Sequence, residues 1–343
     1  MIDELFKLDT VDAERLQDTP IAPLRYVVED LIPQGLHILA GSPKIGKSWL
    51  MLYLCLQVSK GEPIWGYTTN KCDVLYLCLE DTYKRIQNRM FEITDDAPSN
   101  LYFSVTAALL ADGLKEQIKD FISDHRKIGL IVIDTFQRIR GLSFNNNAYA
   151  NDYFDTSQLK DIADDYGVAL ILVHHLRKDT STDPLMMISG STGISGGVDC
   201  NYILVKEKRY SDTARLIISG RDTEYQEITL KFEGCIWKFV SCDKTEDIIK
   251  REIPDFVFQL VSFMEDKEIW SGNATQLLSE MNDELTPVNT VTKLINQYHD
   301  TLFTDNDILY EYSRTSKGRI IQLQHVEKYD SNDSYDGELP AGE

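Results

Sequence analysis

Long apolar runs and basic side chains are scarce in this sequence of 343 residues. The longest apolar runs, such as Leu130–Ile133, are far shorter than the roughly 18 residues that a membrane-spanning helix needs. The chain also does not open on the basic, apolar and small-residue succession of a secretory signal. These absences predict a cytoplasmic protein with no membrane partner.

Basic residues number 35 against 55 acidic ones, so the formal net charge is −20. A chain this acidic is not expected to coat nucleic acid through bulk charge, although local basic strips remain possible. The six cysteines form no CxxC pair and stand near no His cluster, which predicts free thiols in a reducing compartment. A hydrophobic content of 43% is ordinary for a folded chain of one or two domains.

Short apolar runs alternate with longer amphipathic stretches from Gly35 to about Val240. This rhythm predicts an α/β fold, in which parallel strands buried on both faces are joined by right-handed crossovers into a doubly wound sheet. Strands are expected at 36–40, 74–79, 130–133 and 168–173, and helices at 47–59, 83–91, 114–125 and 153–166. Later strands are expected to be antiparallel and to extend one edge of the sheet, at 202–205, 214–219, 227–232 and 236–240.

Four regions are expected: a lead-in over 1–34, the α/β domain over 35–241, a small domain over 242–326 and an acidic, disordered tail over 327–343. In the small domain, helical patterns at 254–265, at 273–281 and from Thr286-Pro287 onward precede a hairpin at 308–312 and 319–324. An Asn or Ser is expected to cap the second helix, and Thr286 is expected to cap the third, with Pro287 at its first helical position. Three short helices and a hairpin predict a winged helix. Residues 241–343 hold 9 basic and 21 acidic side chains, a net charge of −12, so DNA reading and contact with a protein partner both remain open.

The strongest motif lies between an apolar strand and a helical pattern, and it matches the phosphate-loop template GxxxxGK[ST] in full. Backbone N–H groups of such a loop wrap phosphates, so a side chain at Gly41 or Gly46 would block their approach, and the helix N-terminus adds a favourable dipole. Lys47 is expected to reach the β- and γ-phosphates of ATP, and Ser48 to offer its hydroxyl to Mg²⁺. The residues expected to bind the nucleotide are Gly41, Ser42, Pro43, Lys44, Ile45, Gly46, Lys47, Ser48 and Trp49.

Two other apolar strands end in acidic residues. One ends in Asp134, the form of a Walker B motif, and this carboxylate is expected to hold Mg²⁺ beside the loop. The other ends in Glu80-Asp81, and because carboxyl ends of parallel strands face the ligand crevice, Glu80 is placed to polarise the attacking water as a general base. Asp81 could instead cap the helix that starts near Tyr83, so the catalytic role falls to Glu80 first.

A further strand ends in His174-His175. An imidazole pair at this edge of the sheet could sense the γ-phosphate, or it could pack beneath the sheet as part of the core. A metal site is the weaker interpretation, because no third ligand stands at a suitable spacing.

Taken in chain order, the motifs resemble the RecA-like AAA ATPases of the plasmid and phage replicative helicase RepA family. They are Gly41–Ser48, Glu80-Asp81, Ile133-Asp134-Thr135 and Val173-His174-His175. The resemblance extends over about 35–239 and is strongest toward the mobile-element branch, which shares the segments Asn151-Asp152-Tyr153, Ser189–Gly193 and Ser219–Asp222.

The resemblance implies a RecA-like fold and Mg²⁺-dependent ATP hydrolysis. Lys47 and Ser48 would bind nucleotide and Mg²⁺, Glu80 would be the catalytic base, and Asp134 the Walker B acid. His175, rather than His174, stands where the related DnaB-type ring helicases carry a sensor glutamine.

The resemblance further implies a homo-oligomer, a hexameric ring with ATP between neighbours, an arginine reaching across and single-stranded DNA in the channel. The plasmid enzyme has its arginine where this chain has Asp199-Cys200-Asn201-Tyr202, so Arg221 is the better candidate, and Lys206 and Arg209 are weaker ones. DNA would be held by loops after the Walker B and sensor strands. The expected contacts there are Arg138, Arg140, Arg177 and Lys178, for which a solvated surface is the alternative.

Two other functions remain open. One is an ATPase switch without translocation, such as a helicase loader or a DNA-binding replication regulator. The other is a DNA-binding adaptor with a vestigial nucleotide site, against which the intact Lys47, Ser48, Glu80 and Asp134 argue.

Overall fold

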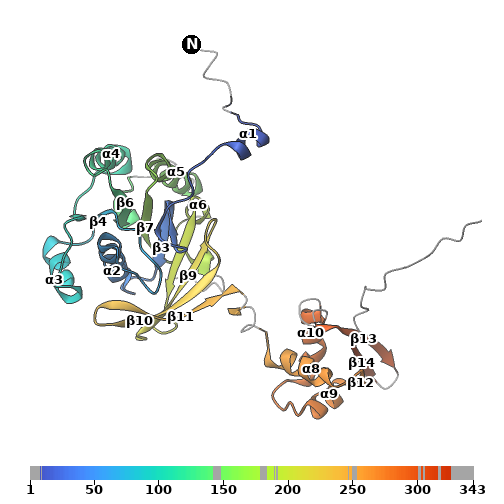
Figure 1. The fold of residues 1–343 in the computed structure, drawn as a ribbon. Coiled ribbons are helices and arrows are strands. Elements are labelled where there is room, and N and C mark those ends of the chain that lie inside the picture. The colour runs from blue at the N-terminus through green and yellow to red at the C-terminus, as the bar shows by residue number, and fades with distance from the viewer. Residues whose placement is uncertain are drawn as a thin grey trace, which may run out of the picture. The chain divides into compact units, whose positions relative to one another are not determined.

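The computed structural model describes residues 8, 10–141, 148–177, 184–188, 190, 192–245, 247–248, 253–299, 303, 306–315 and 318–325. The chain forms two compact units, Met1–Thr245 and Glu246–Glu343 (Figure 1). The acidic tail expected over 327–343 lies outside the described residues. In the part of the chain that is described, every helix is too short or too polar to span a bilayer.

A nine-stranded sheet forms the centre of the first unit, in the order β11-β10-β9-β8-β3-β7-β6-β4-β5. Its strands are β3 (Gly35–Gly41), β4 (Asp73–Cys78), β5 (Leu101–Ser104), β6 (Ile128–Asp134), β7 (Ala169–His175), β8 (Cys200–Val205), β9 (Thr213–Gly220), β10 (Gln226–Glu233) and β11 (Ile236–Lys244). The six strands from β8 to β5 are parallel, and β9, β10 and β11 add an antiparallel edge. The predicted mostly parallel α/β sheet is confirmed, but the predicted direction of β8 is wrong, because β8 pairs parallel with β3.

Helices cover both faces of this sheet (Figure 1). They are α2 (Lys47–Lys60), α3 (Tyr83–Ile93), α4 (Leu114–Asp124), α5 (Ala148–Tyr166) and α6 (Thr192–Gly196), with 3₁₀ turns η1 (Leu110–Asp112), η2 (Phe136–Arg138) and η3 (Pro184–Met187). Successive residues of a strand point to opposite faces, so Leu39 of β3 joins the core beneath α2 and α3, whereas Ile38 joins the core beneath α4 and α5. This double burial is why the parallel strands are apolar throughout.

The expected lead-in over 1–34 is only partly separate from the first unit. β1 (Tyr26–Val28) and β2 (Ile32–Pro33) form a hairpin, and Val28, Leu31 and Ile32 are buried in the core beneath α2. α1 (Ala13–Asp18), by contrast, has no buried residue. At the other end, β11 carries the first unit past the boundary expected at 241.

The second unit is built on a three-stranded antiparallel sheet in the order β12-β14-β13. Its elements are α8 (Asp255–Glu265), β12 (Ile269–Gly272), α9 (Ala274–Met281), α10 (Val288–Tyr298), β13 (Ile308–Thr315) and β14 (Gly318–His325). The three helices and the hairpin were predicted, whereas β12 is an additional strand.

In the second unit, the cap of α9 agrees with the sequence prediction and the cap of α10 differs from it. Asn273 caps α9, accepting from the N–H of Gln276 while its own N–H donates to the Gln276 side chain. Thr286 was expected to cap α10 with Pro287 inside the helix, but Pro287 is itself the N-cap, because its carbonyl accepts the first hydrogen bond, from Thr290 N–H.

Candidate active site

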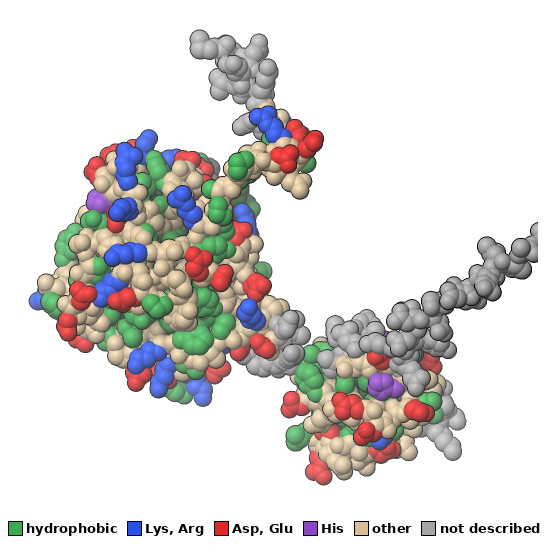
Figure 2. Space-filling view, in the orientation of Figure 1, with side chains coloured by type: hydrophobic (Ala, Val, Ile, Leu, Met, Phe, Trp, Pro, Cys, Tyr) green, Lys and Arg blue, Asp and Glu red, His purple; other side chains and the backbone are tan. Residues whose placement is uncertain are grey.

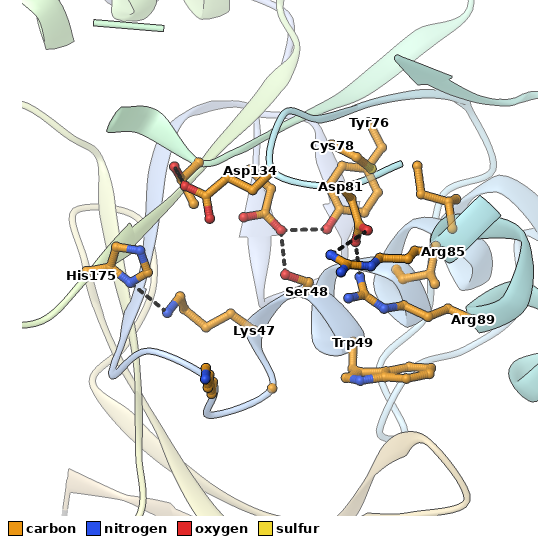
Figure 3. Close-up of a pocket in the computed structure, with 16 residues that line it drawn as sticks. Lys47, Ser48, Trp49, Tyr76, Cys78, Asp81, Arg85, Arg89, Asp134 and His175 are labelled. Atoms are coloured by element: carbon orange, nitrogen blue, oxygen red, sulfur yellow. Dashed lines mark hydrogen bonds and ion pairs between the residues drawn. The ribbon is translucent and has the colours of Figure 1, made fainter. Parts of the chain in front are cut away.

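Four parallel strands end at one cavity of about 500 Å³ (Figure 3). β3 leads into the phosphate loop, β4 leads to Glu80, β6 ends in Asp134 and β7 ends in His175. All four strands are parallel neighbours, so their carboxyl ends fall at the same edge of the sheet. The structure therefore brings together the groups that the sequence placed at separate strand ends.

The phosphate loop is shaped by Gly46, which has φ +110° and precedes α2. A Cβ atom at this position would lie 3.0 Å from the ring of Trp237, which is buried on β11. Trp237 Nε1 also donates to the carbonyl of Gly46 at 3.2 Å. The need for glycine was predicted, but the neighbour that enforces it was not, because Trp237 is remote in sequence and carries no motif.

Lys47 is buried at the mouth of this loop. Its Nζ donates to the carbonyls of Gly41 at 2.7 Å and Ser42 at 3.2 Å, and it lies 3.4 Å from Nδ1 of His175. Burial lowers the pKa of Lys47 to about 8, although the carboxylates of Asp134 and Glu80 act in the opposite direction. The ammonium group thus has carbonyl partners but no ion pair within hydrogen-bond distance among the described residues, so an anionic ligand would meet a poorly compensated cation.

Asp134 lies against the start of α2 (Figure 3). Its Oδ2 accepts from Ser48 Oγ at 2.7 Å and from Tyr76 OH at 3.0 Å. Burial raises the pKa of Asp134, and the two hydrogen bonds partly counteract this. Tyr76 was not predicted as a site residue, and its only signal is its place on the strand that leads to Glu80.

The oxygens of Ser48 and Asp134 fit Mg²⁺, a hard cation that is commonly bound by one or two protein oxygens together with phosphate and water. Among the described residues, no group of three or more His, Cys, Asp or Glu could hold a metal ion. The protein would therefore supply few ligands, and the rest would come from the bound phosphates and water.

Glu80 and Asp81 have different partners. Glu80 Oε1 accepts from Thr135 Oγ1 at 3.1 Å, and its side chain is exposed at the cavity. Asp81 forms an ion pair with Arg89 at 2.5 Å and a longer one with Arg85 at 4.0 Å. Asp81 does not cap α3, because Thr82 occupies the N-cap and accepts from Arg85 N–H. This arrangement leaves Glu80 as the carboxylate that can face a water molecule.

The two histidines separate into a cavity residue and a core residue. His175 lines the cavity, and burial together with the nearby Lys47 lowers its pKa. His174 is 5% exposed and meets the ring of Phe136 edge-on at 5.7 Å. The geometry therefore places His175 at the cavity and His174 beneath the sheet, against Phe136.

An aromatic and guanidinium wall completes the cavity beyond the loop. The Arg89 guanidinium lies 5.4 Å from the ring centroid of Trp49, and both residues line the cavity. Both groups are flat and suited to stacking on a nucleobase. Trp49 was predicted here, whereas Arg85 and Arg89 were missed. Both arginines follow Asp81 at helical spacing, and this is the signal that could have indicated them.

The residues expected to contact DNA are in unlike surroundings. Arg138 donates to the carbonyl of Leu79 at 3.3 Å, and Arg177 is exposed after β7. Arg140 is 14% exposed and pairs with Asp152 at 2.7 Å and Asp155 at 2.6 Å on α5. These ion pairs fasten α5 to Arg140, and the DNA contact expected of Arg140 stays a prediction. Lys178 lies outside the described residues.

Arg221 is at the opposite edge of the sheet from the cavity. β8 runs parallel to β3, with Leu204 beside Gly41. β9 runs antiparallel to β8, with Gly220 beside Cys200, so the end of β9 returns to the far edge. Arg221 follows Gly220 and therefore cannot reach the cavity of its own chain.

The two weaker basic candidates lie after β8. Lys206 donates to the carbonyl of Ser211 and sits 5.1 Å from the ring centroid of Trp237, and Arg209 is exposed.

One protein-family model, described as an AAA domain, matches residues 3–181 of this chain, which is just over half of it. No curated protein matches the chain by sequence.

Among solved structures, the chain is similar to one described as an ATPase domain, with 16% identity and a TM-score of 0.51 over 61% of this chain and 85% of that one. It is also similar to a DnaB-like replicative helicase solved for its interactions with primase, with 16% identity and a TM-score of 0.50 over 61% of this chain and 58% of that one. A KaiC-like protein from Pyrococcus horikoshii OT3 gives 12% identity and a TM-score of 0.47 over 64% of this chain and 100% of that one. At such identities, the first two likenesses show a shared fold.

Proposed function

The chain belongs to the AAA domain family of P-loop ATPases with a RecA-like fold, and we propose that it hydrolyses ATP with Mg²⁺ and acts on single-stranded DNA as a ring-forming replicative helicase of the RepA type. The observation that carries the ATPase part is the meeting of Lys47, Ser48, Glu80, Asp134 and His175 at one cavity. These residues come from four motifs that are separate in the sequence, yet all of them line the same cavity of about 500 Å³.

In this proposal the amides of the phosphate loop and the Lys47 ammonium bind the β- and γ-phosphates. Ser48 and Asp134 hold Mg²⁺, which when bound neutralises phosphate charge. Glu80 accepts a proton from the water that attacks the γ-phosphate in line, and Thr135 fixes one of its oxygens. His175 stands 3.4 Å from Lys47 and registers the loss of the γ-phosphate. Trp49 and Arg89 stack on the adenine.

The first test is Lys47→Ala, assayed for ATP binding and steady-state hydrolysis. Loss of both is expected, because the ammonium group of Lys47 is buried at the mouth of the phosphate loop and lines the cavity. Lys60→Ala is a matched control, since Lys60 ends the same helix and pairs with Asp96 away from the cavity. Hydrolysis that survives Lys47→Ala would refute the site.

The ring and DNA parts of the proposal are supported by where the arginines lie. Arg177 is exposed after β7, which ends at the cavity edge of the sheet. Single-stranded DNA bound at Arg177 would therefore lie close to the nucleotide, and its binding could respond to ATP hydrolysis. Arg221 can serve only a cavity in another copy, which is the arrangement of a ring with nucleotide at subunit interfaces. Strand displacement by a hexameric preparation with ATP tests this part, and a hexamer that separates no strands would remove the helicase role.

A second candidate function is an ATPase switch, such as a loader or a regulator of replication, and the second unit favours it. We include in this proposal that the second unit is a winged helix, which is supported by its order of helix, strand, two helices and two strands. Figure 2 shows more acidic than basic side chains on the visible face of this unit, which suits a protein partner at least as well as DNA. Stimulation of ATP turnover by single-stranded DNA separates the two functions, since a translocase should be accelerated and a switch need not be.

A further inference from the structure

Asp199 is a buried carboxylate at the sheet edge opposite the cavity, and the proposed hydrolysis does not use it. It directly precedes β8, and its side chain is 9% exposed. Oδ2 accepts from the backbone N–H of Leu36 at 2.9 Å and from Nζ of Lys160 at 2.7 Å, and Oδ1 lies 3.4 Å from a guanidinium nitrogen of Arg221. Burying a carboxylate is costly unless its oxygens are paired, and here both oxygens are paired.

The same residue also holds the backbone of Arg221. The N–H of Arg221 donates to the carbonyl of Asp199 at 2.9 Å. The strands approach this closely because residue 220 is glycine: a Cβ atom there would lie 2.8 Å from Cys200 Sγ and 3.1 Å from the carbonyl of Asp199. Arg221 is thereby fixed at its backbone and at its guanidinium, while its side chain remains 64% exposed.

Asp199 is in turn linked to α5 by an ion pair with Lys160, which also pairs with Asp164. The first half of α5 is fastened by the ion pairs between Asp152, Asp155 and Arg140, and Arg140 follows the Walker B strand closely. A single helix therefore connects the cavity edge of the sheet with the carboxylate that holds Arg221.

We propose that Asp199 is the positioning residue of Arg221, holding its exposed guanidinium ready for the phosphates bound by a neighbouring copy. This inference rests on the proposed function, in which Arg221 acts in trans. An arginine side chain has many rotamers, and fixing one nitrogen leaves its other N–H groups free to meet phosphate in a limited range of directions. Such groups contribute most when they are oriented before the reaction, because little reorganisation is then needed.

The first experiment compares Asp199→Asn, Arg221→Ala and Glu227→Gln in the full-length, assembled protein. Asparagine can still accept from Leu36 N–H but no longer attracts the guanidinium. We expect Asp199→Asn to lower kcat about tenfold with little change in KM, and Arg221→Ala to lower it about a thousandfold. Glu227→Gln is the matched control, because Glu227 is a similarly buried carboxylate that pairs with Arg215 on β9; its kcat should not change.

The second experiment mixes variants within one assembly. A Lys47→Ala copy cannot hydrolyse ATP but carries a correctly held Arg221, so it should restore turnover to the intact cavities of an Asp199→Asn copy or an Arg221→Ala copy. A copy with both Lys47→Ala and Asp199→Asn should restore Arg221→Ala far less well. A defect in the fold of the Asp199→Asn copy would not be corrected by its neighbour.

Each remaining result decides against the positioning role of Asp199, against the trans role of Arg221, or against both. Wild-type kcat in Asp199→Asn beside an impaired Arg221→Ala would overturn the positioning role and leave the trans arginine intact. Wild-type kcat in Arg221→Ala would overturn both, and a loss in Asp199→Asn that Lys47→Ala fails to restore would show that Asp199 acts within its own chain. If Asp199→Asn does not fold, Lys160→Met in the same mixing assay takes its place, with a loss of about threefold expected and no loss overturning the inference.

Discussion

Each of the two edges at which the central strands end has a lysine near acidic groups. The pKa of this lysine is shifted in opposite directions at the two edges. At the cavity edge, burial lowers the pKa of Lys47 to about 8. At the far edge, burial alone would lower the pKa of Lys160, but hydrogen bonds to Asp164 and Asp199 outweigh it and raise the pKa. Lys160 is thus compensated by carboxylates of its own chain, whereas Lys47 is poised for an anion. Unmatched charge, more than charge itself, distinguishes the lysine at the cavity.

The largest effect on turnover at the cavity edge is expected from Glu80→Gln. The amide cannot take a proton from the attacking water, so kcat should fall by about 10²- to 10⁴-fold, while ATP binding measured by calorimetry stays near wild type. Glu233→Gln serves as the control, since this exposed carboxylate pairs only with Lys238 in the described structure and should leave kcat unchanged. Unchanged turnover in Glu80→Gln would assign the base to another group.

A smaller effect is expected from Gly46→Ala, which tests whether the loop geometry maintains the cavity edge. The new Cβ would lie 3.0 Å from the buried Trp237 at a φ of +110°, so the loop must shift, at a cost in stability of about 1–3 kcal/mol. Affinity for ATP should fall about tenfold or more. Gly141→Ala meets nothing within 4 Å and should alter neither thermal unfolding nor affinity; equal behaviour of the two variants would contradict the role of Trp237.

The comparison of the two lysines can be tested directly by pH. Bound phosphates favour the charged form of Lys47, so binding above its free pKa of about 8 takes up a proton. ATP affinity should therefore fall about tenfold from pH 7 to pH 9, with proton uptake visible as a dependence of the binding enthalpy on the buffer. Lys47→Arg should remove this dependence, because guanidinium does not titrate in this range. An affinity that is flat in the wild type would show that Lys47 is fully compensated.

The smallest effect is expected from Tyr76→Phe, which removes the 3.0 Å hydrogen bond to Asp134 and leaves the ring in place. Losing one hydrogen bond to a buried carboxylate should cost about 1.5–3 kcal/mol of stability at neutral pH and reduce Mg²⁺-dependent turnover only severalfold. Tyr67→Phe, which loses a hydrogen bond to Gln226 away from the cavity, is the control for stability alone. Equal Mg²⁺ dependence in both variants would place Tyr76 outside the metal site.

Prediction from the sequence was most successful where the signal was local. The expected helix over 47–59 is observed as α2, and the strands that lead to Asp134 and His175 were placed to within a few residues. The separate hairpin β1–β2 was missed, because strands of three and two residues are too short to show a periodic pattern. The direction of β8 was wrong, because strand direction depends on which neighbour the chain pairs with, and short polar turns after β8 suggested only antiparallel partners.

The sequence by itself determined the phosphate loop, the acidic strand ends and the buried parallel strands, since each depends on residue types at short, fixed spacings. Only the tertiary structure decided that Trp237 closes on Gly46, that Tyr76 supports Asp134, that Arg140 fastens α5 and that Asp199 holds Arg221 at the far edge. Most of these contacts join segments that are remote in the chain. Their geometry is set by how strands order and helices pack, and no local periodicity records it.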